Sequence, residues 1–265
     1  MRPLTTRSVL LSTLLGTHPP VMPVAALVRA GALFGISEGS VRTSLTRMVA
    51  RGELETEAGR YRLFGALVDR QRLQDVSRQD PRQPWTGRWV LAVITSSEQS
   101  SADRSQLRSV LQRRFVEQRP GVWARPENLS RDDLGWSALD EHCVRWFAHP
   151  DRDDAALAAD LWDLESWSVE ALRLRRGLAD WQSALDADDP SALRPGFEIS
   201  AAVLRHLVRD PLLPDDLLPR GWGGPALRGD YQRFDQSYQR VIRTWLRAEA
   251  DQLAPERADR ARLQR

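Results

Sequence analysis

The chain has 265 residues, of which 42% are hydrophobic and 28% are charged, and it contains ten Trp. This composition excludes a disordered tail, and the length exceeds the 100 to 150 residues or so of one ordinary domain. No apolar run approaches the roughly 20 residues of a membrane span, and a lone Cys143 with four dispersed His predicts no disulfide and no structural zinc site. We therefore expect a cytoplasmic protein of two or three domains that makes no membrane contact and requires no metal or cofactor.

The net charge of +2 conceals an uneven distribution along the chain. Residues 1–88 hold 13 Arg and 7 acidic residues, whereas residues 151–265 hold 17 Arg and 21 acidic residues. Every basic residue is Arg, which fits the codon bias of a GC-rich genome more simply than a physical preference. The excess of positive charge at the N-terminus indicates that a nucleic-acid partner would bind there.

Apolar periodicity predicts three helices and a hairpin in the N-terminal part. Helices are expected at 7–15, 24–34 and 38–51, with Ser37 as the N-cap of the third, because their apolar residues recur every three or four positions. Short strands at 53–56 and 60–64 flank a Glu-Ala-Gly turn and form a hairpin. Three helices followed by such a wing predict a winged-helix DNA-binding domain.

The third helix carries the clearest functional pattern. Its outer face and the hairpin present hydroxyl groups and guanidinium groups, which suit the base edges and phosphates of a DNA duplex. The candidate DNA-binding residues are Ser40, Arg42, Thr43, Ser44, Thr46, Arg47 and Arg51 on the helix, with Arg60 and Arg62 on the wing. For an isolated helix an ordinary solvated surface would be the simpler interpretation, but the helix order, the wing and the local net charge of +6 favour double-stranded DNA.

The rest of the chain divides by character into a linker and two further domains. After a winged helix at 1–68, residues 69–84 are polar and predict a connecting helix and linker. Residues 85–150 combine predicted strands at 89–94 and 121–124 with a helix at 103–115, and residues 151–265 are almost wholly helical. A Pro-rich loop over 210–225 interrupts the last segment.

Several runs resemble the PaaX family, the phenylacetic acid degradation repressors. The run from Gly35 to Gly52 is similar to the family's recognition region, and the runs at 85–89 and 118–123 are similar to its central domain. Leu-Trp-Asp-Leu at 161–164 and the Pro-rich loop are similar to its C-terminal domain. The resemblance implies a multidomain α+β protein with an N-terminal winged helix-turn-helix, a central ferredoxin-like (Cas2-like) domain and a mostly helical C-terminal domain. It also implies a repressor of a catabolic operon that is released by phenylacetyl-CoA.

Two other function classes remain open at this stage. Cas2-like nucleases place an Asp at the end of the first strand to hold a metal ion, but the corresponding position here is the neutral Thr95, and the nearest carboxylate is Glu98. We therefore expect no catalysis and a role of this domain in dimerisation or packing. A constitutive architectural DNA-binding protein is the third reading, because an arginine-rich surface would suffice for it.

Candidate effector contacts lie in the C-terminal half. His206 and the adjacent Arg205 are on a predicted helix, and Trp222 lies in the Pro-rich loop, where an aryl-acyl thioester would find an aromatic cleft and cations. The simpler alternatives are a surface or helix-end His and a core Trp. The adjacent His142 and Cys143, if they lie on one helix, diverge by about 100° and form no catalytic dyad.

A winged helix alone contacts few base pairs, so useful specificity requires a two-fold arrangement on a symmetric operator. We therefore expect a homodimer whose dimer contacts lie outside the winged helix, with the effector bound by residues 151–265.

Overall fold

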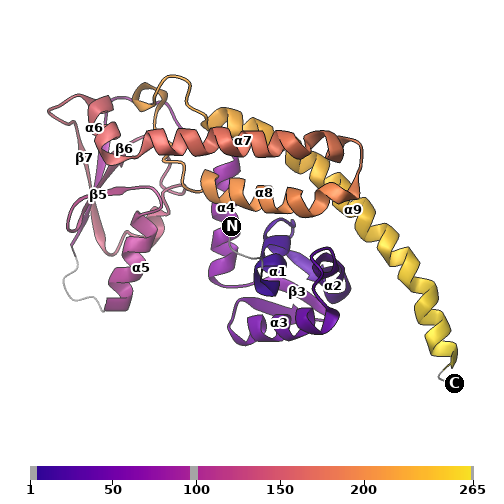
Figure 1. The fold of residues 1–265 in the computed structure, drawn as a ribbon. Helices are drawn as coiled ribbons and strands as arrows, with labels where there is room; N and C mark the ends of the chain where they lie inside the picture. Colours follow the sequence, from indigo (N-terminus) through magenta and orange to yellow (C-terminus); the bar gives the residue numbers. More distant parts are fainter. Residues whose placement is uncertain (1–4, 96–100, 264–265) are drawn as a thin grey trace. The chain divides into compact units, whose positions relative to one another are not determined.

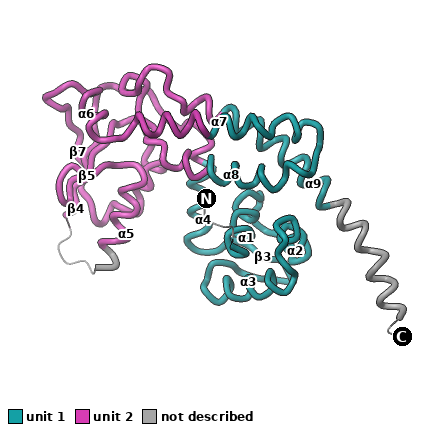
Figure 2. The backbone as a smooth tube through the Cα atoms, viewed as in Figure 1, with its two compact units in different colours: residues 1–75, 174–203, 229–265 teal, residues 76–173, 204–228 magenta. Residues whose placement is uncertain are grey.

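The computed structural model describes residues 5–95 and 101–263 and divides into two compact units (Figure 2). Unit 1 consists of residues 1–75, 174–203 and 229–265, and unit 2 consists of residues 76–173 and 204–228. Each unit thus combines segments that are far apart in the sequence, since the long C-terminal helices contribute residues to both. Domain boundaries at residues 68, 84 and 150, which follow chain order, stay predictions.

Unit 1 begins with a winged helix (Figure 1). The three helices and the hairpin that the sequence predicts are present, with ends that differ by one or two residues. The elements are α1 (Thr6–Leu15), β1 (Val21–Pro23), α2 (Val24–Ala32), α3 (Glu38–Ala50), β2 (Leu54–Glu57), β3 (Arg60–Leu63) and α4 (Ala66–Arg78).

Local side-chain caps fix where α1 and α3 begin. The Thr5 hydroxyl accepts a hydrogen bond from the Ser8 backbone N–H, and the Ser8 hydroxyl accepts one from the Thr5 N–H, which forms a reciprocal capping box. Ser37 caps α3 as predicted, because its hydroxyl accepts from the Ser40 N–H at 3.3 Å. Gly35, with φ of +70°, makes the left-handed turn that separates α2 from α3.

The core of the winged helix lies between these three helices and the sheet. Leu10, Leu14, Leu27, Val41 and Leu45 are each fully buried in it. Complete burial of five aliphatic side chains contributes roughly 1.5 to 3 kcal/mol each to the gross hydrophobic stabilisation. This packing fixes which face of α3 is turned away from solvent.

The wing belongs to a three-stranded sheet of order β1-β3-β2, in which Glu55 lies opposite Arg62. Strand β1 is not predicted by the sequence. It is three residues long and ends at a proline, so it shows too little alternation to be recognised.

Unit 2 contains an antiparallel four-stranded sheet of order β5-β6-β4-β7 with one helix in its chain path. Its elements are β4 (Trp89–Ile94), α5 (Ser101–Leu111), β5 (Val116–Arg119), β6 (Val122–Pro126), η1 (Trp136–Ala138) and β7 (Cys143–Ala148). Counted within this domain, the strand order is 2-3-1-4, which is the ferredoxin-like order, with a short 3₁₀ turn where a second helix would stand. The expected Cas2-like fold is confirmed.

Two details of the central domain differ from the sequence expectation. The helix predicted at 103–115 ends at Leu111, which leaves residues for β5, and His142 and Cys143 do not share a helix. Cys143 instead opens β7, paired with Ile94 of β4. The mix of polar and aromatic residues in β7 gave no periodicity, because as an edge strand it exposes side chains on both faces.

The C-terminal part is helical, as expected. Its elements are α6 (Asp154–Leu161), α7 (Leu164–Asp186), η2 (Pro190–Ala192), α8 (Leu193–Leu207), η3 (Asp215–Leu217) and α9 (Gly224–Leu263). Within unit 1, Gly196 of α8 lets that helix approach the rings of Phe234 and Tyr238 in α9. The Phe34 ring, just after α2, lies 4.8 Å from the Phe197 ring of α8, so the winged helix and the C-terminal helices share one unit.

Candidate nucleic-acid interface

Helix α3 has a buried face and a polar face. Val41, Leu45 and Met48 are buried, and their spacing of three and four residues places them on one side of the helix. Most of the candidate DNA-binding residues of α3 are exposed, while Ser44 is partly buried. The core packing therefore presents the polar face of α3 to solvent.

The exposed residues of α3 divide into two rows. One row lines a hollow of about 670 Å³ together with the beginning of α1. Its predicted members are Ser40, Thr43, Ser44 and Arg47 of α3 and Arg51, the C-cap residue of that helix. The other row contains Arg42 and Thr46, which do not line the hollow, and the Thr46 hydroxyl donates to the Arg42 carbonyl at 3.1 Å.

The first residues of α1 complete the hollow, and the sequence did not point to them. Thr5, Thr6 and Arg7 line it opposite the α3 residues. Two helix N-termini meet at this groove, since Ser37 also lines it, and their free N–H groups favour anions such as phosphates. The capping box at Thr5 and Ser8 is the sequence signal that could have identified this second N-terminus.

The arginines of the interface differ in their partners. Within the described residues, Arg47 and Arg51 take part in no ion pair, so their guanidinium groups are available to a ligand. Arg42 instead pairs with Glu38 at 2.7 Å, and Arg7 makes a two-pronged contact with Glu53. Of the arginines that line the groove, Arg47 and Arg51 are thus unpaired and Arg7 is paired, while the paired Arg42 lies outside it.

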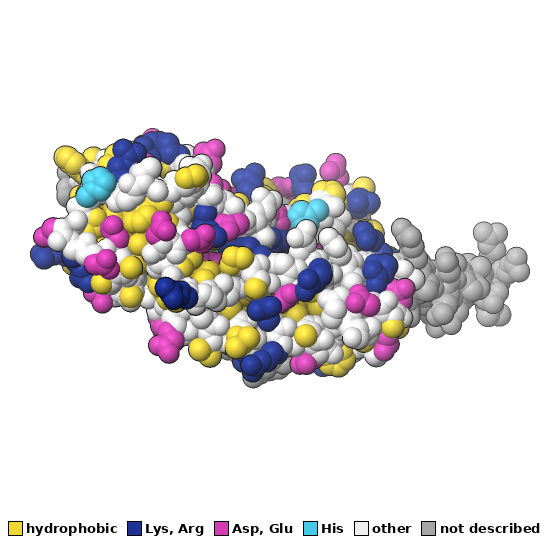
Figure 3. Space-filling view, turned by 90° about the horizontal axis from the view of Figure 1, so that it is seen from above, with side chains coloured by type: hydrophobic (Ala, Val, Ile, Leu, Met, Phe, Trp, Pro, Cys, Tyr) yellow, Lys and Arg dark blue, Asp and Glu magenta, His cyan; other side chains and the backbone are white. Residues whose placement is uncertain are grey.

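The wing presents a second hollow of about 840 Å³ lined by both of its predicted arginines. Arg62 pairs with Glu55 on the neighbouring strand at 2.5 Å. Arg60 makes no ion pair among the residues that the structure describes. Elsewhere, on the face drawn in Figure 3, cationic and acidic side chains are intermixed without a large area of one sign.

The effector candidates differ in burial: His206 is buried, Trp222 is partly buried and Arg205 is exposed. His206 is buried, its Nε2 lies 3.0 Å from the Trp167 carbonyl oxygen, and its ring stacks on Trp167 at 4.3 Å. Trp222 stacks on the same Trp167, also at 4.3 Å. Arg205 is exposed and does not join this stack. The alternative of a surface histidine is wrong, because the aromatic stack buries His206. The alternative of a helix-end residue holds, since His206 lies in the last turn of α8.

Burial sets the chemistry of two titratable side chains that drew attention in the sequence. Desolvation lowers the pKa of His206, only partly offset by its hydrogen bond to the Trp167 carbonyl, so the neutral ring is favoured. Desolvation raises the pKa of Cys143 to about 11, which keeps this thiol protonated at neutral pH.

The described residues contain no cluster of three or more His, Cys, Asp or Glu that could hold a metal ion. Thr95 follows β4, and its backbone N–H donates to the His142 carbonyl at 3.0 Å. Glu98 lies outside the described residues. No described helix has the length and hydropathy to cross a membrane.

Comparison with known proteins gives matches along most of the chain. Three family models match in order: "PaaX-like protein" at residues 5–71, "PaaX protein central Cas2-like domain" at 82–135 and "PaaX-like protein C-terminal domain" at 162–248. The chain is similar to the solved structure of uncharacterized protein Rv0674 from Mycobacterium tuberculosis, with 36% identity and a TM-score of 0.67. The similarity covers 91% of this chain and 99% of that one. A comparison with curated proteins finds no match.

Proposed function

Because the chain belongs to the PaaX family of transcriptional regulators, we propose that it is a ligand-responsive repressor that binds double-stranded operator DNA through the α3 groove. It acts by binding and not by catalysis, in the cytoplasm. The observation that carries the proposal is the groove of α3 and α1, in which Arg47 and Arg51 face solvent without ion-pair partners among the described residues.

The groove suits a duplex in both charge and chemistry. A helix of 13 residues fits the major groove, and guanidinium groups pair with guanine in a two-pronged geometry. The hydroxyls of Thr5 and Ser37 stand at helix N-termini, where backbone phosphates are favoured. In this arrangement Ser40, Thr43, Ser44 and Arg47 read base edges, while Arg51 positions the backbone.

The wing supplies the second contact. Arg60 and Arg62 are placed to meet phosphates or the minor groove, which raises affinity for all sequences similarly. Arg42 and Thr46, outside the groove, meet the flanking backbone once Arg42 exchanges Glu38 for phosphate.

The regulatory half of the proposal concerns the C-terminal helices. We place the effector, an acyl-CoA such as phenylacetyl-CoA, in the C-terminal part, with His206, Arg205 and Trp222 as candidate contacts. The contact between Phe34 and Phe197 supports a route by which α8 influences the winged helix. An effector that prefers one arrangement of these helices lowers operator affinity by its differential binding to that arrangement.

Repression from a symmetric operator also requires a homodimer. The test of the proposal is a titration of full-length protein against a duplex from the region upstream of its own gene, with and without phenylacetyl-CoA. Specific binding that the thioester weakens supports the proposal. Equal binding to a scrambled duplex contradicts operator recognition.

A further inference from the structure

Arg114, between α5 and β5 in unit 2, is a buried cation without a partner. Its side chain is 3% exposed, and none of its three guanidinium nitrogens has a hydrogen-bond acceptor among the described residues. The backbone holds it in place, since its N–H donates to the Leu111 carbonyl and its carbonyl accepts from Arg125 Nη1 at 2.9 Å. A buried guanidinium is normally paired, because an unpaired charge carries the full desolvation penalty.

Arg125 increases this local positive charge. It is fully buried, and all of its acceptors are neutral: the carbonyls of Pro126, Arg114 and Leu212 and the side-chain oxygen of Asn128. Burial, together with the neighbouring Arg114, lowers the pKa of Arg125 to about 9. Arg125 therefore contributes a second buried cation without a contacting carboxylate.

The carboxylates near this pair are already engaged. Asp210, 2% exposed, accepts from Arg228 Nη2 at 2.8 Å and from the Leu212 N–H at 2.9 Å. Asp133 accepts from the Ser130 hydroxyl at 2.6 Å. Both act on Arg114 only through their fields, without hydrogen bonds to it. The buried arginines thus outnumber the buried acid that lies among them.

We propose that Arg114 is the anchor of an oxyanion site that binds the carboxylate or phosphate group of a small-molecule effector. A carboxylate or phosphate supplies the acceptor oxygens and the negative charge that the guanidinium group lacks, and Arg matches either group in a two-pronged geometry. The inference rests on the proposed function, since it assigns the ligand class and a binding residue to the regulatory half of the protein.

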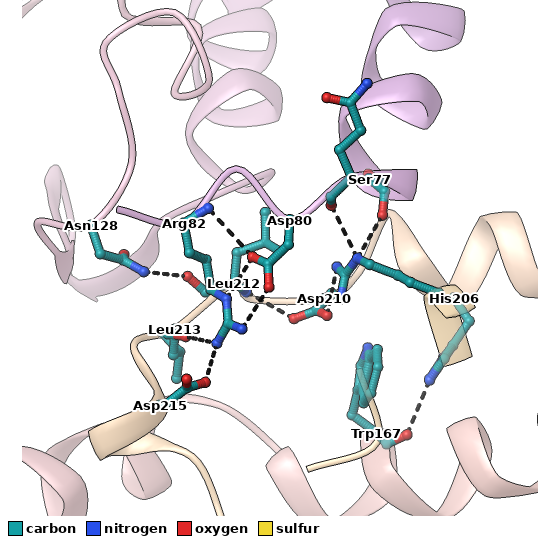
Figure 4. A network of polar contacts seen from close by, with 12 residues as sticks. Ser77, Asp80, Arg82, Asn128, Trp167, His206, Asp210, Leu212, Leu213 and Asp215 are labelled. Atoms are coloured by element: carbon teal, nitrogen blue, oxygen red, sulfur yellow. Dashed lines mark hydrogen bonds and ion pairs between the residues drawn. The ribbon is translucent and has the colours of Figure 1, made fainter. Parts of the chain in front are cut away.

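Arg125 connects the site to the loop of Asp210 and Leu212, because its Nη2 donates to the Leu212 carbonyl at 3.3 Å. Figure 4 shows this loop and its contacts with Asn128. Leu212 is buried with φ of +53°, and its carbonyl accepts from Asn128 at 2.8 Å while its N–H donates to Asp210. Left-handed backbone at a branched residue persists only where surrounding contacts impose it. An anion at Arg114 changes the field at Asp210, one of those contacts, and this loop leads directly to α9.

The test is thermal unfolding of full-length protein at constant ionic strength with four probes: inorganic phosphate, acetate, phenylacetate and coenzyme A. At 100 times Kd, the bound anion raises the melting temperature by about 5 to 10 °C. Phosphate also stabilises proteins nonspecifically, so the shift is read as the difference from Arg114→Met, with the exposed neighbour Arg113→Met as the matched control. Shifts from phosphate or coenzyme A alone assign a phosphate group, and shifts from acetate or phenylacetate alone assign a carboxylate.

The inference predicts a saturable shift in wild type and Arg113→Met that Arg114→Met lacks. Without probe, Arg114→Met melts at or above the wild-type temperature, because the variant no longer buries an unpaired charge. A lower melting temperature together with an unchanged probe response would show a structural role and overturn the inference. If Arg114→Met fails to fold, calorimetric titration of the wild type with the four probes decides the question. The absence of saturable binding for all four probes then overturns the inference.

Operator binding by the wild type without probe is measured in parallel. Sequence-specific operator binding without any shift of the melting temperature by the probes refutes the oxyanion site alone. The absence of both the operator binding and the shift refutes the proposed function.

Discussion

Arg42 Nη2 lies 2.7 Å from Glu38 Oε1, one turn earlier on α3, while Arg47 further along the helix makes no ion pair among the described residues. Glu38 therefore neutralises Arg42, which lies beside the groove, and leaves Arg47 inside the groove unpaired. Both partners of this pair are more than half exposed, so the pair contributes little to stability and is readily exchanged for a phosphate.

Glu38→Gln should bind DNA more tightly than the wild type, by up to about fivefold, because Arg42 no longer has to leave a carboxylate. Fluorescence anisotropy with operator and scrambled duplexes measures the gain. Both duplexes should gain alike if Arg42 meets the backbone. Unchanged affinity for both would show that Arg42 does not approach DNA.

Arg47→Ala should weaken operator binding by about 5- to 150-fold, since each two-pronged contact with a base contributes about 1 to 3 kcal/mol. The fold should be unaffected, because the side chain is exposed. Arg113→Ala, an exposed arginine of unit 2, is the control and should bind as the wild type does. Equal losses for both variants would point to a general effect of charge.

Arg60→Ala in the wing should reduce the slope of log affinity against log salt concentration by about 0.9, the value for one phosphate contact. The discrimination between operator and scrambled duplex should stay the same. Arg62→Ala should show a smaller change, since Arg62 is already paired with Glu55. A loss of discrimination in Arg60→Ala would assign it to base reading instead.

Gly31→Ala should destabilise the winged helix by about 1 to 3 kcal/mol, because the added Cβ would lie 2.6 Å from Cγ2 of the fully buried Val41. Gly39→Ala is the matched control, since a Cβ there meets nothing within 4 Å. Urea unfolding of both variants measures the difference. Equal stability of the two would contradict the close packing of α2 on α3.

Stability should fall as the pH drops below the ordinary histidine value of about 6.5. The pKa of His206 is lower in the folded protein than in the unfolded chain. The unfolded state therefore binds the proton at higher pH, and this protonation stabilises it relative to the folded state. The fields of Glu170 and Asp210 oppose this shift, and Arg209 adds to it. His206→Gln should show a weaker loss between pH 7.5 and 5.5 in urea unfolding, while His149→Gln, an exposed histidine, controls for the loss of one ring. An identical loss in wild type and His206→Gln would contradict the buried neutral ring.

The sequence predicted those helices and strands whose apolar pattern extends over several residues and whose caps are made by residues nearby in the chain. The helices of the winged helix, the Ser37 cap and the strand at β4 follow from residues close together in the chain. The contribution of α1 to the groove was not predictable in this way, because it depends on the tertiary packing of α1 on α3.

The burial of polar side chains was also not predictable from the sequence. Arg114 is read in the sequence as one of two adjacent arginines, and nothing local distinguishes it from the exposed Arg113. Its burial arises from long-range contacts of its neighbourhood, such as the bond from Arg125 to the Leu212 carbonyl, across 87 positions. The stack of His206 on Trp167 likewise joins residues 39 positions apart.

The central claim, that the α3 groove recognises an operator, is tested most directly by the specificity ratio of one variant. Full-length wild type and Arg47→Ala/Arg51→Ala are titrated at about 150 mM salt against the upstream duplex and a scrambled duplex of equal length. The wild type should prefer the upstream duplex by at least about 10³-fold, and the variant should lose most of this preference. A variant that keeps the wild-type ratio would contradict the account.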